Sequence, residues 1–192
     1  MRHGDTVMNQ KNELRGWDDP ELDPLGHEQG KKAAAKISSL DIPIHHIYSG
    51  TLKRTRDTAK YVSDVTGVQT SQTPGLNPWD YGQFTGQKEN HKTLKKLKFF
   101  QDRPQIQVPQ GESFASFHKR YGDTLKAAAD YVHRFPDKCL VLVTHSRNLY
   151  PTRNILNGKS RIPLKDTEFG PGTVHKIEFA ADKSGKFRMD KI

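Results

Sequence analysis

The sequence feature that most constrains the fold is the apolar run Cys139–Thr144, Cys-Leu-Val-Leu-Val-Thr. A continuous run of β-type residues is typical of a strand that is buried on both faces, as in a parallel sheet covered by helices. A strongly amphipathic helix is predicted before this run, from an N-cap at Ser113 to about Phe135. The run ends at His145-Ser146-Arg147-Asn148, and another helix is predicted to follow, to about Leu156. Strands that alternate with helices predict an α/β fold with a mainly parallel sheet.

The remaining segments extend the same alternation over the 192 residues, which are enough for one hydrophobic core. We expect one domain spanning residues 1–192, a three-layer α/β/α sandwich with an antiparallel edge. The predicted elements are a helix at 24–40 with Leu25, Ala33, Ile37 and Leu40 on one side, a strand at 42–48, a helix at 51–65 burying Leu52, Ala59, Val62 and Val65, an edge strand at 68–73, and closing strands at 173–179 and 187–192 around a turn at Lys183-Ser184-Gly185.

The segment 76–110 is irregular, and we interpret it as an active-site loop followed by a small helical insertion over the site. Its first part is rich in turn-forming residues. Its second part, residues 88–103, carries six basic and two acidic residues and a short amphipathic pattern. Two interpretations of the basic residues stay open: a solvated lysine face, or a lid that contacts an anionic substrate.

The charge balance favours an anionic partner. Lys and Arg number 31 against 22 Asp and Glu, a formal charge of +9, which suits phosphoesters, nucleic acid or acidic lipid. No apolar run approaches the roughly 18 residues of a membrane span, and the N-terminus has no secretory hydrophobic segment. The single Cys139 favours a reducing compartment, so we expect a cytoplasmic location and no membrane partner. No Cys/His spacing indicates zinc, and His45-His46 is interpreted as a solvated strand pair.

Residues suited to phosphate chemistry follow several of the predicted strands or open the chain. Arg2-His3-Gly4 combines a fixed cation, a nucleophile that can be neutral and a flexible backbone position. Arg54 falls in the first turn of a predicted helix, where the positive helix end favours an anion, and His145 comes just after the central strand. Because ligands bind beyond the carboxyl ends of strands in such sheets, we expect these side chains to converge on one pocket.

The chain resembles the phosphoglycerate-mutase-like histidine phosphatase superfamily over nearly its whole length. Six motifs appear in the family's order. The first three are Arg2-His3-Gly4-Asp5-Thr6 with Asn9, then Arg15-Gly16-Trp17 followed by Leu22–Gly26, then Ser49–Ala59, where Gly50 stands in place of a second serine. The last three are the loop 76–86, Gly111-Glu112-Ser113, and His145 after a Val-rich strand. The resemblance implies that His3 carries the phosphoryl group as a phosphohistidine, while Arg2, Arg54 and His145 surround its oxygens. Asn9, Arg15 and the Ser146 backbone are expected to make further contacts. No metal or nucleotide cofactor is expected, and the expected partner is a small phosphorylated anion.

The chain departs from the family in two places. The family's general acid is usually a glutamate two residues after the leucine aligned with Leu76, and here Pro78 stands at that position. Proline cannot donate a proton, so Asp80 is our first candidate and Glu112 the second; alternatively, Asp80 caps a turn. The family also has an apolar strand before the Arg-His-Gly motif, whereas only Met1 precedes Arg2. We therefore expect either that the sequence starts late or that another segment fills the place of that strand.

The expected activity is that of a phosphomonoester phosphatase. A mutase must keep its phosphohistidine from water under a closed lid, and this chain has only a compact insertion and lacks the usual glutamate. The alternatives are a phosphoglycerate-mutase-type phosphotransferase and a non-catalytic phosphate- or nucleic-acid-binding module on the same scaffold. The lysine-rich insertion favours the binding module, and the two intact histidines argue against it, so nucleic acid is the lesser expectation. The sequence leaves the substrate and the oligomeric state open.

Overall fold

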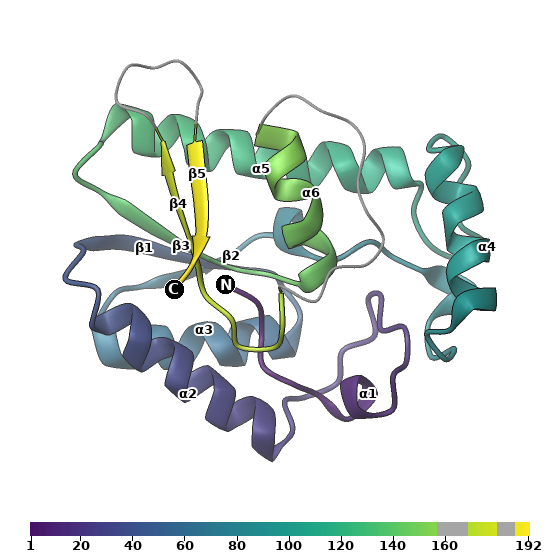
Figure 1. The fold of residues 1–192 in the computed structure, drawn as a ribbon, viewed down its shortest axis with the longest axis horizontal. Helices are drawn as coiled ribbons and strands as arrows, with labels where there is room; N and C mark the ends of the chain where they lie inside the picture. Colours follow the sequence, from purple (N-terminus) through teal and green to yellow (C-terminus); the bar gives the residue numbers. More distant parts are fainter. Residues whose placement is uncertain (157–168, 180–186) are drawn as a thin grey trace.

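The computed structural model describes residues 1–156, 169–179 and 187–192, and it has the predicted α/β architecture (Figure 1). The turn predicted at residues 183–185 lies outside the described residues. In chain order the elements are α1 (Val7–Gln10), α2 (Pro24–Ser38), β1 (Ile44–Ser49), α3 (Lys53–Thr66), β2 (Thr70–Gln72), the 3-10 turns η1 (Pro74–Leu76) and η2 (Gly82–Phe84), α4 (His91–Asp102), α5 (Phe114–Arg134), β3 (Cys139–Val143), α6 (Ser146–Leu156), β4 (His175–Phe179) and β5 (Phe187–Lys191).

The central sheet is parallel, with the strand order β2-β1-β3. The predicted short edge strand therefore lies at an edge, and the apolar run Cys139–Val143 pairs with β1. The closing strands β4 and β5 form an antiparallel pair. The parallel sheet confirms the predicted α/β architecture, the antiparallel pair β4-β5 forms a two-stranded sheet of its own, and the ends of β1 and β3 lie side by side.

The N-terminal residues continue the parallel sheet beside β3. Arg2 forms a parallel bridge with Thr144, and the His3 amide donates a hydrogen bond to the Thr144 carbonyl at 3.0 Å. On the other side, the Arg2 amide donates to the Thr173 carbonyl at 3.0 Å. Met1 is buried among core residues, and burial lowers the pKa of its α-amino group to about 5. These pairings fix the backbone of His3 at the carboxyl end of β3.

Helices cover both faces of the sheet (Figure 1). The helices α2 and α3 lie on one face, and their core cluster includes Ala34, Val62 and the strand residues Ile47 and Val143. The helices α5 and α6 lie on the other face, over a second cluster rich in aromatic side chains. The predicted N-cap of α5 is present, because the Ser113 hydroxyl accepts a hydrogen bond from the Ser116 amide. The three-layer sandwich thus follows from amphipathic helices that bury their apolar stripes against one sheet.

Two residues predicted to be buried are exposed: Leu25 by 53% and Val65 by 50%. The buried side of α2 runs instead through Gly26 and Gly30. Glycine is needed there because a Cβ on Gly26 would lie only 2.0 Å from the Asp5 carbonyl oxygen. The helix therefore packs directly against backbone, and Leu25, the large apolar residue beside this contact, faces solvent.

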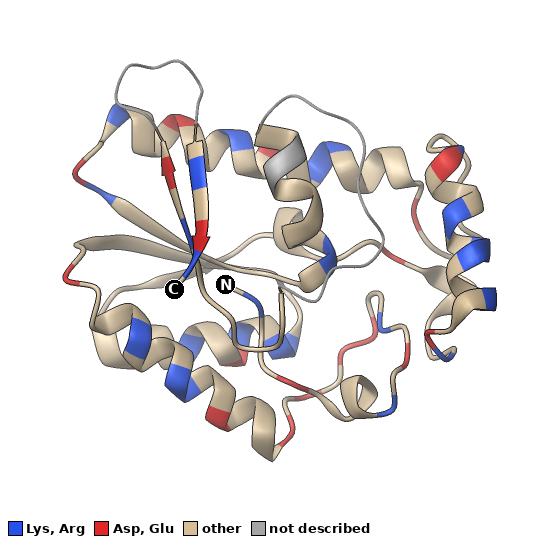
Figure 2. Cartoon of the chain, in the orientation of Figure 1, with Lys and Arg blue, Asp and Glu red and all other residues tan. Residues whose placement is uncertain are grey.

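The insertion forms α4, which the short amphipathic pattern predicted. Leu97 is buried on its inner side, whereas Lys92, Lys95, Lys96 and Lys98 are exposed. In Figure 2, the ribbon of α4, at one end of the molecule, carries several segments in the colour of Lys and Arg. The position agrees with the solvated lysine face rather than with a lid that contacts the substrate.

Candidate active site

A cavity lies at the carboxyl ends of β1 and β3, where the predicted residues were expected to converge. Its lining includes four of them: His3, Arg15, Arg54 and His145. The other described residues of the lining are Leu14, Gly16, Pro78, Tyr81, Glu89 and Arg147. The chain therefore brings segments more than 140 positions apart to one place, through strand pairing and the loops that follow the strands.

His3 is 1% exposed and is held in one ring orientation. Its Nδ1 lies 2.6 Å from the Gly4 carbonyl oxygen, which can only accept, so Nδ1 carries the proton. The unprotonated nitrogen is then Nε2, the atom with a lone pair for attack. Burial, followed by the charges of Arg54 and Arg2, holds the pKa of His3 well below its ordinary value of 6.5. The ring is thus neutral and nucleophilic at physiological pH.

Arg54 is 1% exposed and anchors the loop that surrounds it. Its Nη1 donates to the Asp18 carbonyl at 2.6 Å and its Nη2 to the Gly16 carbonyl at 2.9 Å. Gly16 adopts a φ of +47°, in the left-handed region that glycine tolerates best, and this turn directs the loop around the guanidinium. Burial, then the charge of Arg15, lowers the pKa of Arg54 to about 9, so the group stays cationic at neutral pH.

His145 contacts His3 edge to face, with ring centroids 4.9 Å apart. The Arg54 Nε donates to its Nδ1 at 3.4 Å, so the ring proton resides on Nε2. That Nε2 is buried and has no hydrogen-bond partner within the described part of the chain. Burial and the charge of Arg54 hold the pKa of His145 well below 6.5. His145 therefore presents a neutral N–H donor beside the nucleophilic nitrogen, where a phosphoryl oxygen would satisfy it.

The remaining predicted phosphate contacts, Arg2, Asn9 and Ser146, are not in the described lining of the cavity. The Arg2 Nη1 donates to the Phe169 carbonyl at 2.7 Å, and its buried Nε has no partner among the described residues. Burial lowers the pKa of Arg2 to about 10. Asn9 accepts a hydrogen bond from the Thr6 hydroxyl at 2.8 Å, and Ser146 begins α6. The contacts predicted for Asn9 and Ser146 stay predictions.

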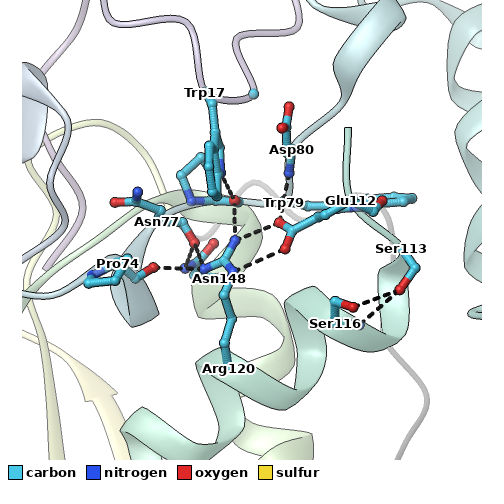
Figure 3. Close-up of polar contacts among 12 residues, drawn as sticks. Trp17, Pro74, Asn77, Trp79, Asp80, Glu112, Ser113, Ser116, Arg120 and Asn148 are labelled. Atoms are coloured by element: carbon cyan, nitrogen blue, oxygen red, sulfur yellow. Dashed lines mark hydrogen bonds and ion pairs between the residues drawn. The ribbon is translucent and has the colours of Figure 1, made fainter. Parts of the chain in front are cut away.

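The loop 76–82 is held over the sheet by a network centred on Arg120 (Figure 3). The Arg120 guanidinium donates to the carbonyl oxygens of Pro74, Asn77 and Pro78 at 2.7–2.9 Å. It also forms a bidentate ion pair with Glu112, at 2.6 and 3.1 Å. The position of Pro78 in the cavity lining thus depends on an arginine of α5 that the motifs did not single out.

Both candidates for the proton donor have other partners in this network. Glu112 pairs with Arg120 and accepts from the Asp80 amide at 2.9 Å, which explains the Gly-Glu-Ser motif as a brace for the loop (Figure 3). The Asp80 carboxylate accepts from the Gly82 amide at 3.0 Å, the geometry of an Asx turn. Neither residue is in the described lining of the cavity, and the catalytic role predicted for Asp80 stays a prediction.

Three charged or polar lining residues were missed by sequence reasoning: Tyr81, Glu89 and Arg147. Arg147 donates to Glu89 at 2.7 Å and lies over the Tyr81 ring, 5.9 Å from its centroid. Burial alone would lower the pKa of Arg147, but Tyr81 and Glu89 raise it. The Tyr81 hydroxyl is buried, without a hydrogen-bond partner in the described structure, and burial raises its pKa. Their positions were the available signal: Tyr81 lies in the predicted active-site loop, Glu89 lies at the start of the predicted insertion, and Arg147 follows His145 by two residues.

Gly50, which replaces the second serine of the family motif, has a structural reason in this chain. A Cβ at this position would lie 2.8 Å from the Asn77 Oδ1 and 3.0 Å from the Thr55 hydroxyl. Asn77 uses that oxygen to accept from the Thr51 amide, and its Nδ2 donates to the Thr51 hydroxyl. Glycine therefore leaves room for the contact between the loop and the start of α3.

Within the described residues, no group of three or more His, Cys, Asp or Glu side chains is arranged to hold a metal ion. Among the helices of the same residues, none combines the length and the apolar character that a membrane crossing requires.

The fold and the paired histidines at the ends of its strands define an α/β enzyme of the histidine phosphatase type. Residues 1–189 match the model of the histidine phosphatase superfamily (branch 1), and the chain belongs to this superfamily. Two relatives are named 2,3-bisphosphoglycerate-dependent phosphoglycerate mutase. The protein from Mesorhizobium japonicum is 24% identical to this chain and the protein from Brucella ovis is 28% identical, and each alignment covers 96% of this chain and 92% of the relative.

Solved structures of similar fold include a mycobacterial glucosyl-3-phosphoglycerate phosphatase, determined with VO3, at a TM-score of 0.77 and 22% identity over 98% of this chain and 94% of that one. Another is a putative alpha-ribazole-5'-P phosphatase from Escherichia coli, at a TM-score of 0.73 and 18% identity over 100% of this chain and 93% of that one. At these identities the likeness supports the fold alone.

Proposed function

We propose that the protein is a phosphomonoester phosphatase that acts through a phosphohistidine on His3. The observation that carries this proposal is the His3 ring, which is neutral, fixed by the Gly4 carbonyl and unprotonated at Nε2. It lies in a cavity with Arg15 and Arg54, beside the free donor of His145. A nucleophile surrounded by cations and N–H donors suits a phosphoryl group, whose transition state spreads negative charge over three oxygens.

The proposed reaction has two steps, and both take place at the Nε2 of His3. The Nε2 of His3 attacks phosphorus and the bond to the leaving oxygen breaks, while the guanidinium groups and His145 hold the phosphoryl oxygens. Water then attacks the phosphohistidine, the phosphorus–nitrogen bond breaks, and inorganic phosphate leaves. Splitting one substitution into two is the usual advantage of a covalent intermediate. The arginines supply fixed positive charge, so the residues themselves meet the electrostatic demand of both steps.

A mutase-type phosphotransferase is the second candidate, because relatives covering most of the chain are named mutases. A mutase must exclude water while the phosphohistidine waits for the bound product. The insertion beside this site is one helix, α4, with its lysines in solvent, and it does not supply the closed lid that a mutase needs. We therefore favour hydrolysis.

The test is release of inorganic phosphate from an aryl phosphate and from a panel of phosphorylated metabolites, with the wild type and His3→Ala. We expect turnover that requires His3 and that vanadate inhibits, as a mimic of the phosphoryl group. A parallel assay follows conversion of 3-phosphoglycerate to 2-phosphoglycerate in the presence of 2,3-bisphosphoglycerate. Isomerisation faster than phosphate release would establish the mutase, and salt-sensitive nucleic-acid binding without turnover would establish the binding module.

The expected substrate is a small phosphorylated anion, which the cationic cavity favours. We propose the cytoplasm as the compartment, because the cysteine content suits a reducing environment. Fractionation of cells that express the tagged protein would test this location.

A further inference from the structure

The cavity wall has a proline where the superfamily resemblance leads one to expect the proton donor. Pro78 is buried and lines the cavity, while its carbonyl accepts from Trp17 Nε1 at 2.9 Å and from Arg120 at 2.7 Å. A phosphatase that cleaves alkyl phosphates needs an acid, because an alkoxide is a poor leaving group until it is protonated. The donor must therefore come from another residue that reaches the cavity.

Glu89 is the carboxylate of the described cavity lining. Its position is fixed by a short antiparallel pairing between residues 12–14 and 87–89: its amide donates to the Asn12 carbonyl at 2.7 Å, and Asn12 Nδ2 donates back to the Glu89 carbonyl at 2.9 Å. The next pair along the ribbon is the bridge between Glu13 and Lys88. This pairing attaches Glu89 to the segment that also carries Arg15, and it directs the two side chains to the same cavity.

The charges around Glu89 give it two different environments. Its carboxylate accepts from the Arg147 guanidinium at 2.7 Å, with a quarter of the Glu89 side chain exposed to solvent. Arg15 and Arg54 line the same cavity. A bound phosphate dianion would draw these guanidinium groups to its own oxygens and would place negative charge near Glu89. Phosphate binding would therefore exchange the Arg147 contact of Glu89 for a negatively charged neighbour.

We propose that Glu89 protonates the leaving oxygen and that Arg147 positions the Glu89 carboxyl group; this proposal rests on the phosphatase activity proposed above. As His3 Nε2 bonds to phosphorus, the phosphorus–oxygen bond breaks, its electron pair stays on the leaving oxygen, and the Glu89 carboxyl proton moves to that oxygen to give an alcohol. In the second step the Glu89 carboxylate takes a proton from the attacking water. The water oxygen bonds to phosphorus, the phosphorus–nitrogen pair returns to Nε2, and phosphate is released with Glu89 protonated again.

The test compares kcat/KM of Glu89→Gln and wild type on two substrates, glycerol 2-phosphate and p-nitrophenyl phosphate. The first releases a strongly basic alkoxide and the second a phenolate that needs little protonation. General acid catalysis typically contributes about 10²–10⁴-fold, so we expect a loss of about a hundredfold or more on glycerol 2-phosphate. The loss on p-nitrophenyl phosphate should stay within about threefold, because the chemical step on that substrate gains little from an acid.

Glu13→Gln is the matched control, since it makes the same substitution on the same ribbon at a residue that pairs with Lys88. It should leave the ratio of the two rates unchanged. Glu89→Asp keeps a carboxyl group on a shorter side chain, and it should recover part of the glycerol 2-phosphate rate. Because this variant keeps the acid while it weakens the Arg147 contact, it separates the effects of losing each of them. Melting temperatures of all variants would report any damage to the fold.

Equal losses on both substrates in Glu89→Gln, with no recovery in Glu89→Asp, would overturn the role of Glu89 while leaving hydrolysis through His3 intact. A loss confined to glycerol 2-phosphate in Asp80→Asn or Tyr81→Phe, and not in Glu89→Gln, would assign the donor to that residue instead. Absence of His3-dependent hydrolysis of either substrate by the wild type would overturn the phosphatase and this proposal together.

Discussion

The floor and the wall of the cavity are built in different ways. The floor, which consists of His3, Arg54 and His145, is held by backbone at the ends of strands and in the first turn of α3. The wall, which consists of Pro78, Tyr81, Glu89 and Arg147, comes from a loop, a short ribbon and the start of α6. Wall positions depend on side-chain contacts such as Glu89–Arg147 and Arg120–Glu112. The floor can therefore keep one chemistry while the wall changes its residues.

The largest effect is expected from His3→Ala, which removes the nucleophile from the floor of the cavity. His3→Ala should lower kcat/KM on every phosphomonoester by about a thousandfold or more, because the covalent route is lost. Measurements of phosphate release on an aryl and an alkyl phosphate would show equal losses. The matched control is His91→Ala in α4, whose exposed ring lies outside the described lining of the cavity. A His3 variant that retains most of its activity would contradict this assignment.

Arg54→Gln should cost about a hundredfold to a thousandfold in kcat/KM, which is the usual loss when one donor to a developing oxyanion is removed. The same loss on alkyl and aryl phosphates would place Arg54 with the phosphoryl group rather than with the leaving group. Arg56→Gln, an exposed residue of the same helix, is the control and should change little. A loss restricted to alkyl phosphates would instead show that Arg54 acts on the leaving group, a role assigned here to the residues of the wall.

Arg120→Ala should lower the free energy of unfolding, because it removes the cation paired with Glu112 and one hydrogen-bond donor from each of three loop carbonyls. Breaking a largely buried charge pair of this kind typically costs about 3–5 kcal/mol, and we expect about 2–3 kcal/mol here because the pair is partly exposed. Denaturant unfolding would measure the change. Lys119→Ala, at the exposed neighbouring position, should stay near the wild type. An unchanged unfolding free energy for Arg120→Ala would show that the loop does not need this brace.

The pH dependence of stability follows from the two neutral histidines of the floor. Their pKa values are held well below 6.5 by burial and by Arg54, whereas the unfolded rings take up protons near pH 6.5. Below that pH the unfolded state binds more protons, so the stability is present above pH 6.5 and is lost as the pH falls. The melting temperature should drop by several degrees between pH 7 and pH 5.5, with a shallower slope in His3→Asn. Identical slopes would contradict neutral burial of His3.

The smallest effect is expected at α4, which lies outside both floor and wall. Replacing Lys92 and Lys95 by alanine should change kcat/KM by less than about twofold at low and at moderate salt, because exposed charges are well screened. Steady-state rates at two ionic strengths would check this. A large loss at low salt alone would show that the lysine face attracts or holds the substrate.

The floor of the cavity could be predicted from the sequence, whereas most of the wall could not. The helix from Ser113, the strand Cys139–Val143 and the floor residues were predictable, because periodicity and strand ends determine where they lie. The face of α2 was predicted incorrectly at Leu25, since the closest packing uses Gly26 and a hydrophobic pattern gives glycine no weight. Glu89 was missed because its place depends on pairing with Asn12, a contact between loops that no local pattern records.

If His3 carries the phosphoryl group, mass spectrometry of the trapped intermediate will find the group on this residue. The protein would be mixed with p-nitrophenyl phosphate, quenched in alkali, where phosphohistidine survives, and digested for peptide mapping. We predict one added phosphoryl group on His3 in the N-terminal peptide, absent in His3→Ala and lost when the quench is delayed beyond substrate exhaustion. A phosphoryl group on another residue, or turnover with no labelled peptide at any quench time, would contradict the account.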